Sequence, residues 1–229
     1  MIGAMIARYL AAMICGYILG SIPWGLIVAK RMAKVDVREW GSGKIGATNV
    51  LRSAGKKVAI VTALLDILKG AAAVILAGFI LEKSYVMVGS LGFGALFGQV
   101  LAGLAAVAGH NWSIFLGFRG GSGVAVFFGG WIALLPMVAL FGGEVLFLGA
   151  ASTLFVSLGS IAGVVGTYVI LVPLTIYAGF PVEYLFYALL GGGMIIYTHR
   201  GNIKRLLTGK ERKLGQKADK AQPDTGKAV

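Results

Sequence analysis

The chain has 229 residues, of which 58% are hydrophobic and only 13% are charged, and its mean hydropathy is +0.86. A soluble globular domain is about half apolar and about one quarter charged, so this composition excludes an ordinary soluble domain and a disordered chain. The single cysteine, Cys15, excludes an internal disulfide and a cysteine metal site. What remains is a polytopic membrane protein.

The net charge of +12 is concentrated in two segments. Of the 21 Lys and Arg residues, eight lie between Lys30 and Lys57 and nine between Arg200 and Lys227. Membrane proteins retain such basic segments on the cytoplasmic side. Nucleic-acid binding would require a recognition surface beside this charge, and the sequence contains none. The charge therefore predicts membrane topology and no nucleic-acid partner.

Apolar runs long enough to cross a bilayer follow one another along the chain. About 20 apolar residues span the hydrocarbon core, and the first three such runs are Ile2–Val28, Val58–Leu81 and Val86–Ala108. If residues 30–57 are cytoplasmic, the N-terminus lies outside. The stretch 124–197 then holds an even number of spans, because the basic C-terminal segment is expected inside as well.

Two ordinary spans or four short ones fit the stretch 124–197, and we prefer four. Short helices require shielding by neighbours, because lipid satisfies no backbone group. The predicted fold is an all-α polytopic membrane protein with seven transmembrane helices, some short, and cytoplasmic glycine-rich loops; five helices are the alternative. The short spans are expected at Val124–Leu135, Val145–Ser157, Ile161–Ile176 and Tyr184–Tyr197. Residues 1–214 form the membrane domain, and residues 215–229 are expected to be a disordered polar cytoplasmic tail.

Three segments rich in glycine and polar residues face the cytoplasm in this topology: Gly41–Gly55, Gly109–Ala125 and Thr198–Leu214. Glycine-rich backbone exposes N–H groups that bind anions, and arginine adds charge and paired hydrogen bonds. The segments together predict a phosphate site at the inner membrane surface. A G-x-G-x-x-G pattern begins at Gly41, but a membrane span follows it in place of a βαβ unit, so we reject dinucleotide binding.

Individual residues in these segments have simpler explanations as well. Arg119 precedes a glycine-rich helix start, where anions bind, although a flexible turn has the same composition. His199, Asn202 and Arg205 recur every three residues and share one helix face, whereas a surface amphipathic helix explains only the neighbouring lysines. Asp66 lies three residues before Lys69 within a span, and we expect the two to neutralise each other.

The ordered motifs resemble the PlsY family of acyl-phosphate:glycerol-3-phosphate acyltransferases. The resemblance begins with GYILGSIPWG (16–25) and continues through GSGKIGATNVLRSAG (41–55), LDILKG (65–70), GHNWSIFLGFRGGSGVA (109–125) and HRGNIKRLLTGKE (199–211). It implies an inner-membrane enzyme with seven spans, which transfers a fatty acyl group from acyl phosphate to the sn-1 hydroxyl of glycerol 3-phosphate. The products would be lysophosphatidic acid and phosphate, and neither a metal nor another cofactor is implied. No obligate protein partner is inferred.

The resemblance also assigns roles, in agreement with the polar segments. The candidate catalytic residues are Ser42, Arg52, His199 and Asn202, and the candidate substrate-binding residues are Lys44, Thr48, Asn49, Arg119, Gly120, Gly121, Ser122, Gly123 and Arg205. Glu211 matches a structural glutamate. Three positions depart from the family pattern: Lys44 replaces Asn, Arg119 replaces Lys, and Ser122 replaces a second Lys. Our hypothesis is that Lys44 restores the charge that Ser122 lacks.

Acyl phosphate is an activated mixed anhydride, so the protein has to supply positioning and positive charge more than a strong nucleophile. We therefore expect direct transfer without an acyl-enzyme, with His199 or the substrate's own phosphate as the base. The bundle would receive the acyl chain from the membrane lipid phase. The rival interpretations are a transporter of a small phosphorylated or anionic solute and a divergent paralogue of low activity.

Overall fold

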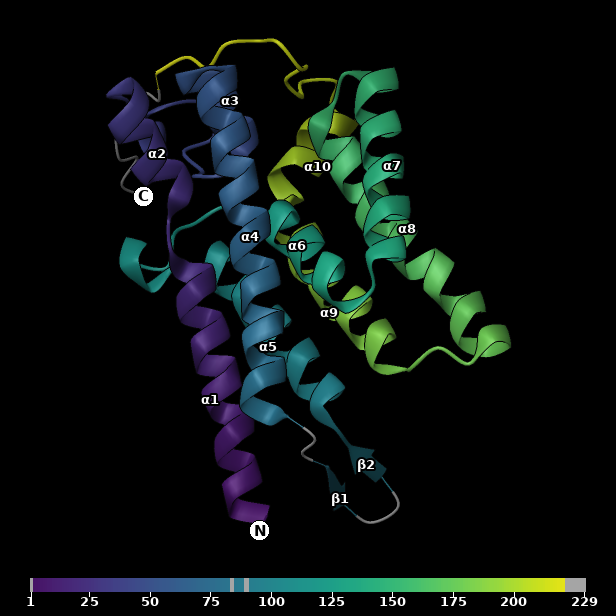
Figure 1. Cartoon of the computed structure of the whole chain (residues 1–229). Coiled ribbons are helices and arrows are strands. Elements are labelled where there is room, and N and C mark those ends of the chain that lie inside the picture. The colour runs from purple at the N-terminus through teal and green to yellow at the C-terminus, as the bar shows by residue number, and fades with distance from the viewer. Residues whose placement is uncertain (1, 83–84, 89–90, 221–229) are drawn as a thin grey trace, which may run out of the picture.

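The computed structural model describes residues 2–82, 85–88 and 91–220. Helices form most of this part of the chain, and one antiparallel hairpin joins two of them (Figure 1). The helices are α1 (Ile2–Ser21), α2 (Trp24–Ala33), α3 (Ala47–Ala54), α4 (Lys56–Leu81), α5 (Ala95–Asn111), α6 (Val124–Leu134), α7 (Pro136–Thr153), α8 (Val156–Ala178), α9 (Glu183–Thr198) and α10 (Arg200–Leu207), and the strands are β1 (Val86–Val88) and β2 (Leu91–Phe93). The predicted helical membrane fold is confirmed.

Five stretches of the described chain are long and apolar enough to cross a membrane: Gly3–Ala33, Lys56–Leu81, Ala95–Leu116, Pro136–Thr153 and Val156–Ala178. Two further apolar helices are shorter, with 11 residues in α6 and 16 in α9. Each packs against longer helices, α6 on α4 and α7, and α9 on α5 and α8. Their neighbours thereby provide the shielding that a short helix needs in lipid.

The first apolar run is two helices, whereas the sequence predicted one over Ile2–Val28. Pro23 lacks the N–H that would continue α1, so the helix ends at Ser21 and α2 begins after the proline. Lys69 of α4 lies at this break, where its Nζ donates to the carbonyl oxygens of Gly20 at 2.7 Å and Ile22 at 2.8 Å. The carbonyls left without helical partners are thus satisfied from the neighbouring helix.

Two further boundaries differ from the sequence-based expectation. Val86–Val88 and Leu91–Phe93 form paired strands instead of the start of a helix over Val86–Ala108, because a short apolar run does not distinguish strand from helix. The helix expected at Val145–Ser157 contains a real break, since α7 ends at Thr153. Leu154 adopts the left-handed conformation there, with φ 63°, and non-glycine residues do so too rarely for the sequence to predict it.

The long helices form two groups with α6 and α9 between them (Figure 1). Helices α1, α4 and α5 pack together, and α7 pairs with α8. The backbones of α1 and α5 approach closely at Gly16 and Gly20, where a Cβ atom would collide with the carbonyl oxygens of Ala102 and Ala106. Small residues permit such contacts between membrane helices. A cavity lined by residues of α4, α6, α7 and α8 lies between the two helix groups.

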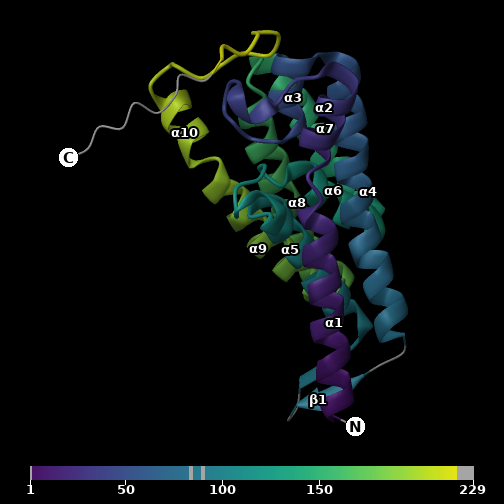
Figure 2. The ribbon, with the colours of Figure 1, turned by 90° about the vertical axis from the view of Figure 1, so that its left-hand side faces the viewer.

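The N-terminus and the hairpin lie at one end of the molecule, and α2, α3 and α10 lie at the other, which we term the α3 end (Figures 1 and 2). Residues 214–220 cross the α3 end. The Ala218 N–H donates to the Arg52 carbonyl at 3.1 Å, and the Gly41 N–H donates to the Asp219 carbonyl at 3.0 Å. These bonds involve residues 215–220 of the expected tail, whereas its remainder, 221–229, lies outside the described residues.

Candidate active site

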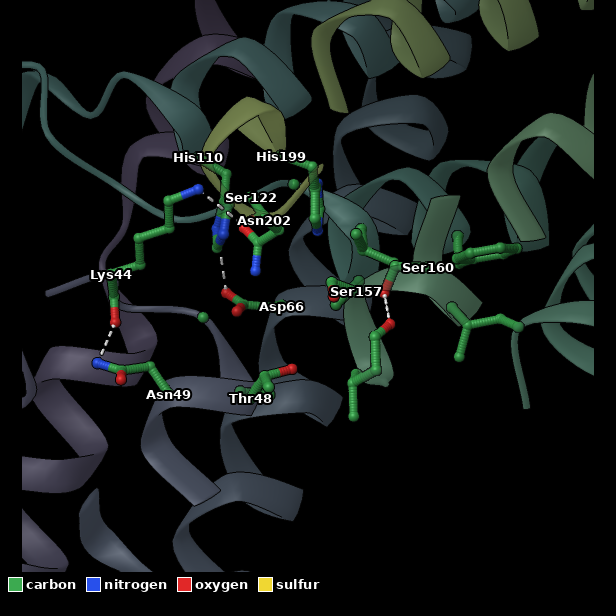
Figure 3. Close-up of a pocket in the computed structure, with 18 of the residues that line it drawn as sticks. Lys44, Thr48, Asn49, Asp66, His110, Ser122, Ser157, Ser160, His199 and Asn202 are labelled. Carbon is green, nitrogen blue, oxygen red and sulfur yellow. Dashed lines mark hydrogen bonds and ion pairs between the residues drawn. The ribbon is translucent and has the colours of Figure 1, made fainter. Parts of the chain in front are cut away.

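A cavity of about 580 Å³ extends from the α3 end into the bundle. Its polar wall is formed by Ser42, Lys44, Thr48, Asn49, Arg52, Asp66, His110, Ser122, Ser157, Ser160, His199, Asn202, Arg205, Glu211 and Arg212 (Figure 3). Its apolar wall comes from α4, α6, α7 and α8 and includes Ile67, Phe128, Ile132, Pro136, Leu140, Leu146 and Val156. One space thus adjoins both charged groups and hydrocarbon.

The first glycine-rich loop is held in shape by Asn49, which is buried. Its Nδ2 donates to the carbonyl oxygens of Val37, Trp40 and Lys44 at 2.9–3.0 Å, and its Oδ1 accepts from the Ser42 N–H at 3.1 Å. The loop therefore wraps around one amide, with Gly41 and Gly43 at positive φ to allow the turns. This arrangement places Ser42 and Lys44 on the cavity wall, while the Asn49 amide itself is engaged by the loop.

Helix α3 contributes Thr48 and Arg52 to the cavity. The Arg52 guanidinium is half-buried, and its Nη2 donates to the Arg212 carbonyl at 3.0 Å. Burial lowers the pKa of Arg52, and although Glu211 raises it, Arg212 and Arg205 lower it further. Because arginine remains charged throughout the physiological range, Arg52 is a fixed cation with donors available to an anion.

The second glycine-rich segment wraps around His110 at the end of α5. The Gly121 N–H donates to the His110 carbonyl at 2.9 Å. A Cβ on Gly120 would collide with that carbonyl oxygen, and a Cβ on Gly121 would collide with the His110 ring. These glycines therefore serve close packing. Ser122 and Gly123 do line the cavity, whereas Arg119 is exposed and lies outside its wall.

Glu211 organises the third segment. Its carboxylate is buried, and Oε1 accepts from Ser157 Oγ at 2.9 Å and from Asn202 Nδ2 at 2.7 Å. Oε2 accepts from Arg205 Nε at 2.7 Å. Burial raises the pKa of Glu211, but the hydrogen bonds from Asn202, Ser157 and Arg205 outweigh it, so the net pKa lies below its ordinary value. The ionised carboxylate thus attaches α10 to α8.

His199 is buried between α9 and α10, and its ring has one defined partner. Nδ1 lies 2.8 Å from the Ile195 carbonyl oxygen, which can only accept, so Nδ1 carries the proton and Nε2 keeps a lone pair. Burial lowers the pKa of His199, and the net direction is downward despite the Ile195 hydrogen bond. The imidazole on the cavity wall is therefore neutral, with a basic nitrogen.

The structure adds polar residues that the sequence did not single out as ligands. Ser157 and Ser160 of α8 line the cavity, and a pair of serines in an apolar helix carries no motif that would have marked them. Asp66 lies 3.1 Å from Lys69 Nζ and 3.6 Å from His110 Nδ1. The expected pairing of Asp66 with Lys69 is confirmed, and His110 joins it at the inner end of the polar wall.

Most of the predicted site residues converge on this one cavity. Those on its wall are Ser42, Lys44, Thr48, Asn49, Arg52, Ser122, Gly123, His199, Asn202 and Arg205, and those away from it are Arg119, Gly120 and Gly121. The three segments are far apart in sequence but meet at the α3 end. Among the residues that the structure describes, no group of three His, Cys, Asp or Glu side chains is arranged to hold a metal ion.

The fold and the site define an integral membrane protein in which three glycine-rich segments form one cationic cavity beside an apolar groove. Residues 10–209 match the family model described as glycerol-3-phosphate acyltransferase, so the chain belongs to this family, the PlsY acyltransferases.

Named relatives cover the chain almost completely. The protein named glycerol-3-phosphate acyltransferase 3 of Dehalococcoides mccartyi strain CBDB1 is 58% identical over 93% of this chain and 99% of its own length. The glycerol-3-phosphate acyltransferase of Clostridioides difficile strain 630 is 42% identical over the same shares. The crystal structure of PlsY, an integral membrane glycerol 3-phosphate acyltransferase, in its glycerol 3-phosphate form has a TM-score of 0.77 and 39% identity, covering 90% of this chain and 96% of that one.

The Glu211 network predicts a pH-dependent stability. Because the folded pKa lies below the ordinary value of 4.5, the carboxylate stabilises the fold above that pH, and this contribution is lost as the pH falls through the folded pKa. We expect Glu211→Gln to lower the free energy of unfolding by about 1.5–3 kcal/mol at pH 7, with a smaller difference below pH 4.5. Thermal unfolding of the purified protein measures both. The exposed Glu39→Gln is the control, and equal effects of the two substitutions would contradict the role of the network.

Proposed function

We propose that the protein transfers a fatty acyl group from acyl phosphate to the sn-1 hydroxyl of glycerol 3-phosphate, producing lysophosphatidic acid and inorganic phosphate. The observation that carries this proposal is the two-part cavity, in which the three glycine-rich segments line one wall and apolar side chains line the other. Family membership agrees with it. An acyl phosphate has the same two parts, a dianionic head and a hydrocarbon chain.

The polar wall supplies the charge that two phosphorylated reactants require. Arg52 and Lys44 are cations without a carboxylate partner among the described residues, whereas Arg205 is paired with Glu211. Phosphate groups carry up to about two negative charges each at pH 7. Guanidinium and ammonium groups bind them by charge-assisted hydrogen bonds. The phosphates therefore belong between α3 and the start of α6, with the acyl chain directed along α6 and α7.

The reaction on these residues is a single displacement at the acyl carbon. The sn-1 hydroxyl oxygen attacks the carbonyl carbon, the bond from that carbon to the phosphate oxygen breaks, and inorganic phosphate leaves with the electron pair. Arg52 and the neighbouring donors stabilise the charge that develops on the departing phosphate and on the carbonyl oxygen. The hydroxyl proton goes to Nε2 of His199, whose lone pair is available on the cavity wall.

The serine contacts support direct transfer without an acyl-enzyme. Ser157 Oγ donates to Glu211 and Ser160 Oγ donates to the Val156 carbonyl. Within the described part of the chain, no serine hydroxyl is hydrogen-bonded to a histidine, and Cys15 lies in α1 away from the cavity wall. A nucleophile activated by a base, which an acyl-enzyme needs, has no counterpart in this arrangement.

We further propose that the enzyme resides in the bacterial inner membrane with the α3 end in the cytoplasm and the N-terminus outside. The basic segments 30–57 and 200–227 support this orientation, because positive charge is retained inside. Helices α6 and α9 complete seven crossings in this arrangement. Glycerol 3-phosphate then enters and inorganic phosphate leaves on the cytoplasmic side, while the acyl donor and the product remain in contact with lipid.

The donor assay tests the proposed function. Purified protein is incubated with glycerol 3-phosphate and either palmitoyl phosphate or palmitoyl-CoA, and lysophosphatidic acid is measured. We expect product from palmitoyl phosphate alone. Product from palmitoyl-CoA alone would overturn the proposed donor, and absence of product from both, together with solute flux in liposomes, would establish the transporter interpretation instead.

His199→Ala tests the base. Loss of general-base catalysis slows turnover by about 10²–10⁴, so we expect kcat to fall at least about 100-fold while KM for glycerol 3-phosphate changes less than threefold. Initial rates with palmitoyl phosphate give both constants. A loss of kcat smaller than about threefold would show that the substrate's own phosphate takes the proton.

Gly143→Leu tests the apolar wall as the acyl site. Gly143 lies on the cavity wall, and a Cβ there has no neighbour within 4 Å, so leucine fills the groove without disturbing the protein. We expect kcat/KM for a 16-carbon acyl phosphate to fall at least about tenfold relative to that for an 8-carbon one. Gly193→Leu, at an equally open position away from the cavity, is the control. Equal losses for both chain lengths would place the chain elsewhere.

A further inference from the structure

Lys44 is the residue at which the three glycine-rich segments meet. It lies in the first loop, and its Nζ donates to Ser122 Oγ of the second segment at 3.2 Å and to the Thr198 carbonyl, next to His199, at 2.5 Å. The side chain therefore reaches across the polar end of the cavity toward the start of α6 (Figure 3). Thr198 Oγ1 in turn donates to the Ser122 carbonyl at 3.3 Å.

The Lys44 ammonium lacks a balancing charge. It has three N–H donors, two of which point to the neutral acceptors on Ser122 and Thr198. No carboxylate within the described residues forms an ion pair with it. Burial lowers the pKa of Lys44, and Arg200 and Arg205 lower it further. A partly buried cation without a partner is unfavourable, and an anion bound in the cavity would remove this penalty.

The contact with Ser122 shows where that anion belongs. The start of α6 presents Ser122 and Gly123 on the cavity wall, and an anion there meets the positive end of the helix dipole. Ser122 contributes no charge of its own, and Arg119 of the same segment is exposed outside the wall. The cation beside this helix start is therefore the one that Lys44 brings from the first loop.

We propose that Lys44 binds the phosphate of one reactant at the start of α6, in the place where the segment itself carries only Ser122. This proposal rests on the acyltransferase function proposed above. The ligand chemistry is a phosphate monoester dianion or an acyl phosphate, and the two sources are distinguished by which KM changes. Lys44 is thus a substrate-binding residue that lies in the first segment, whereas the family pattern has this lysine at position 122 of the second. The positive charge beside the start of α6 is the same in both arrangements.

The test moves the lysine from position 44 to position 122. KM for glycerol 3-phosphate and KM for palmitoyl phosphate are measured in the wild type, in Lys44→Asn and in the double variant Lys44→Asn with Ser122→Lys. A charge-assisted hydrogen bond to phosphate corresponds to about 10- to 100-fold in affinity, so we expect Lys44→Asn to raise one KM by that factor. The double variant, which places the ammonium on α6 itself, should return that KM to within about threefold of the wild type.

A matched control and a binding measurement separate this role from folding. Lys57→Asn removes an exposed lysine at the start of α4 that does not line this cavity, and we expect both KM values to stay within twofold. Stabilisation of the purified protein by glycerol 3-phosphate, measured as a shift in the thermal midpoint, gives a second readout independent of turnover. If the glycerol 3-phosphate KM is the one that changes, this shift should shrink in Lys44→Asn and recover in the double variant.

Two outcomes would overturn the proposal: both KM values unchanged in Lys44→Asn, or no recovery of the altered KM in the double variant. Failure of the proposed function has a different signature, since the wild type itself would then form no lysophosphatidic acid from palmitoyl phosphate. In that case thermal shifts measured with glycerol 3-phosphate and, separately, with palmitoyl phosphate decide on Lys44. Equal shifts in wild type and Lys44→Asn with both ligands would reject its phosphate contact.

Discussion

A buried ion pair at the break between α1 and α2 supports the α3 end of the molecule. Lys69 Nζ lies 3.1 Å from Asp66 and donates to the carbonyls of Gly20 and Ile22. Within a membrane these carbonyls have no water to bond with. Lys69 supplies a donor to both, and the Trp24 N–H supplies a second donor to the Ile22 carbonyl at 3.0 Å. Asp66 balances the charge of Lys69. Helix α2, and the glycine-rich loop that follows it, take their position from this junction.

The Asp66 carboxylate also links the α1–α2 break to the cavity. Asp66 lies on the cavity wall, 3.6 Å from Nδ1 of His110, and the backbone of the second glycine-rich segment packs on His110. The ion pair therefore contacts both the break before α2, through Lys69, and the ring on which the second segment packs, through Asp66. Of the cavity's two carboxylates, Asp66 is neutralised by Lys69 and Glu211 by Arg205. The described cations of the wall that form no such ion pair are Arg52, Lys44 and Arg212. In the proposed reaction, Arg52 and Lys44 are the ones that balance negative charge on the reactants.

The sequence predicted the parts of this fold that depend on composition and spacing. Apolar length identified α4 nearly to the residue, and the density of polar residues identified the three segments that meet at the cavity. Boundaries set by backbone conformation were missed, because nothing in the sequence marks Leu154 as left-handed. Pro136, by contrast, begins α7 as its first residue, a position that proline favours, so a stricter use of that signal would have placed the helix correctly.

The contacts of the candidate site residues show that position in a motif is not enough to assign a residue to the cavity. Gly120 and Gly121 resemble an anion-binding loop in sequence, yet their lack of side chains is needed for packing on His110. Arg119, adjacent in sequence, is exposed, whereas Lys44, which is 78 residues away from Ser122 in the chain, contacts it directly. A long side chain from one loop can therefore replace a charge that another segment lacks. The proposed reaction requires positive charge around two phosphates. Because three segments converge on the cavity, a residue from any of them can supply that charge.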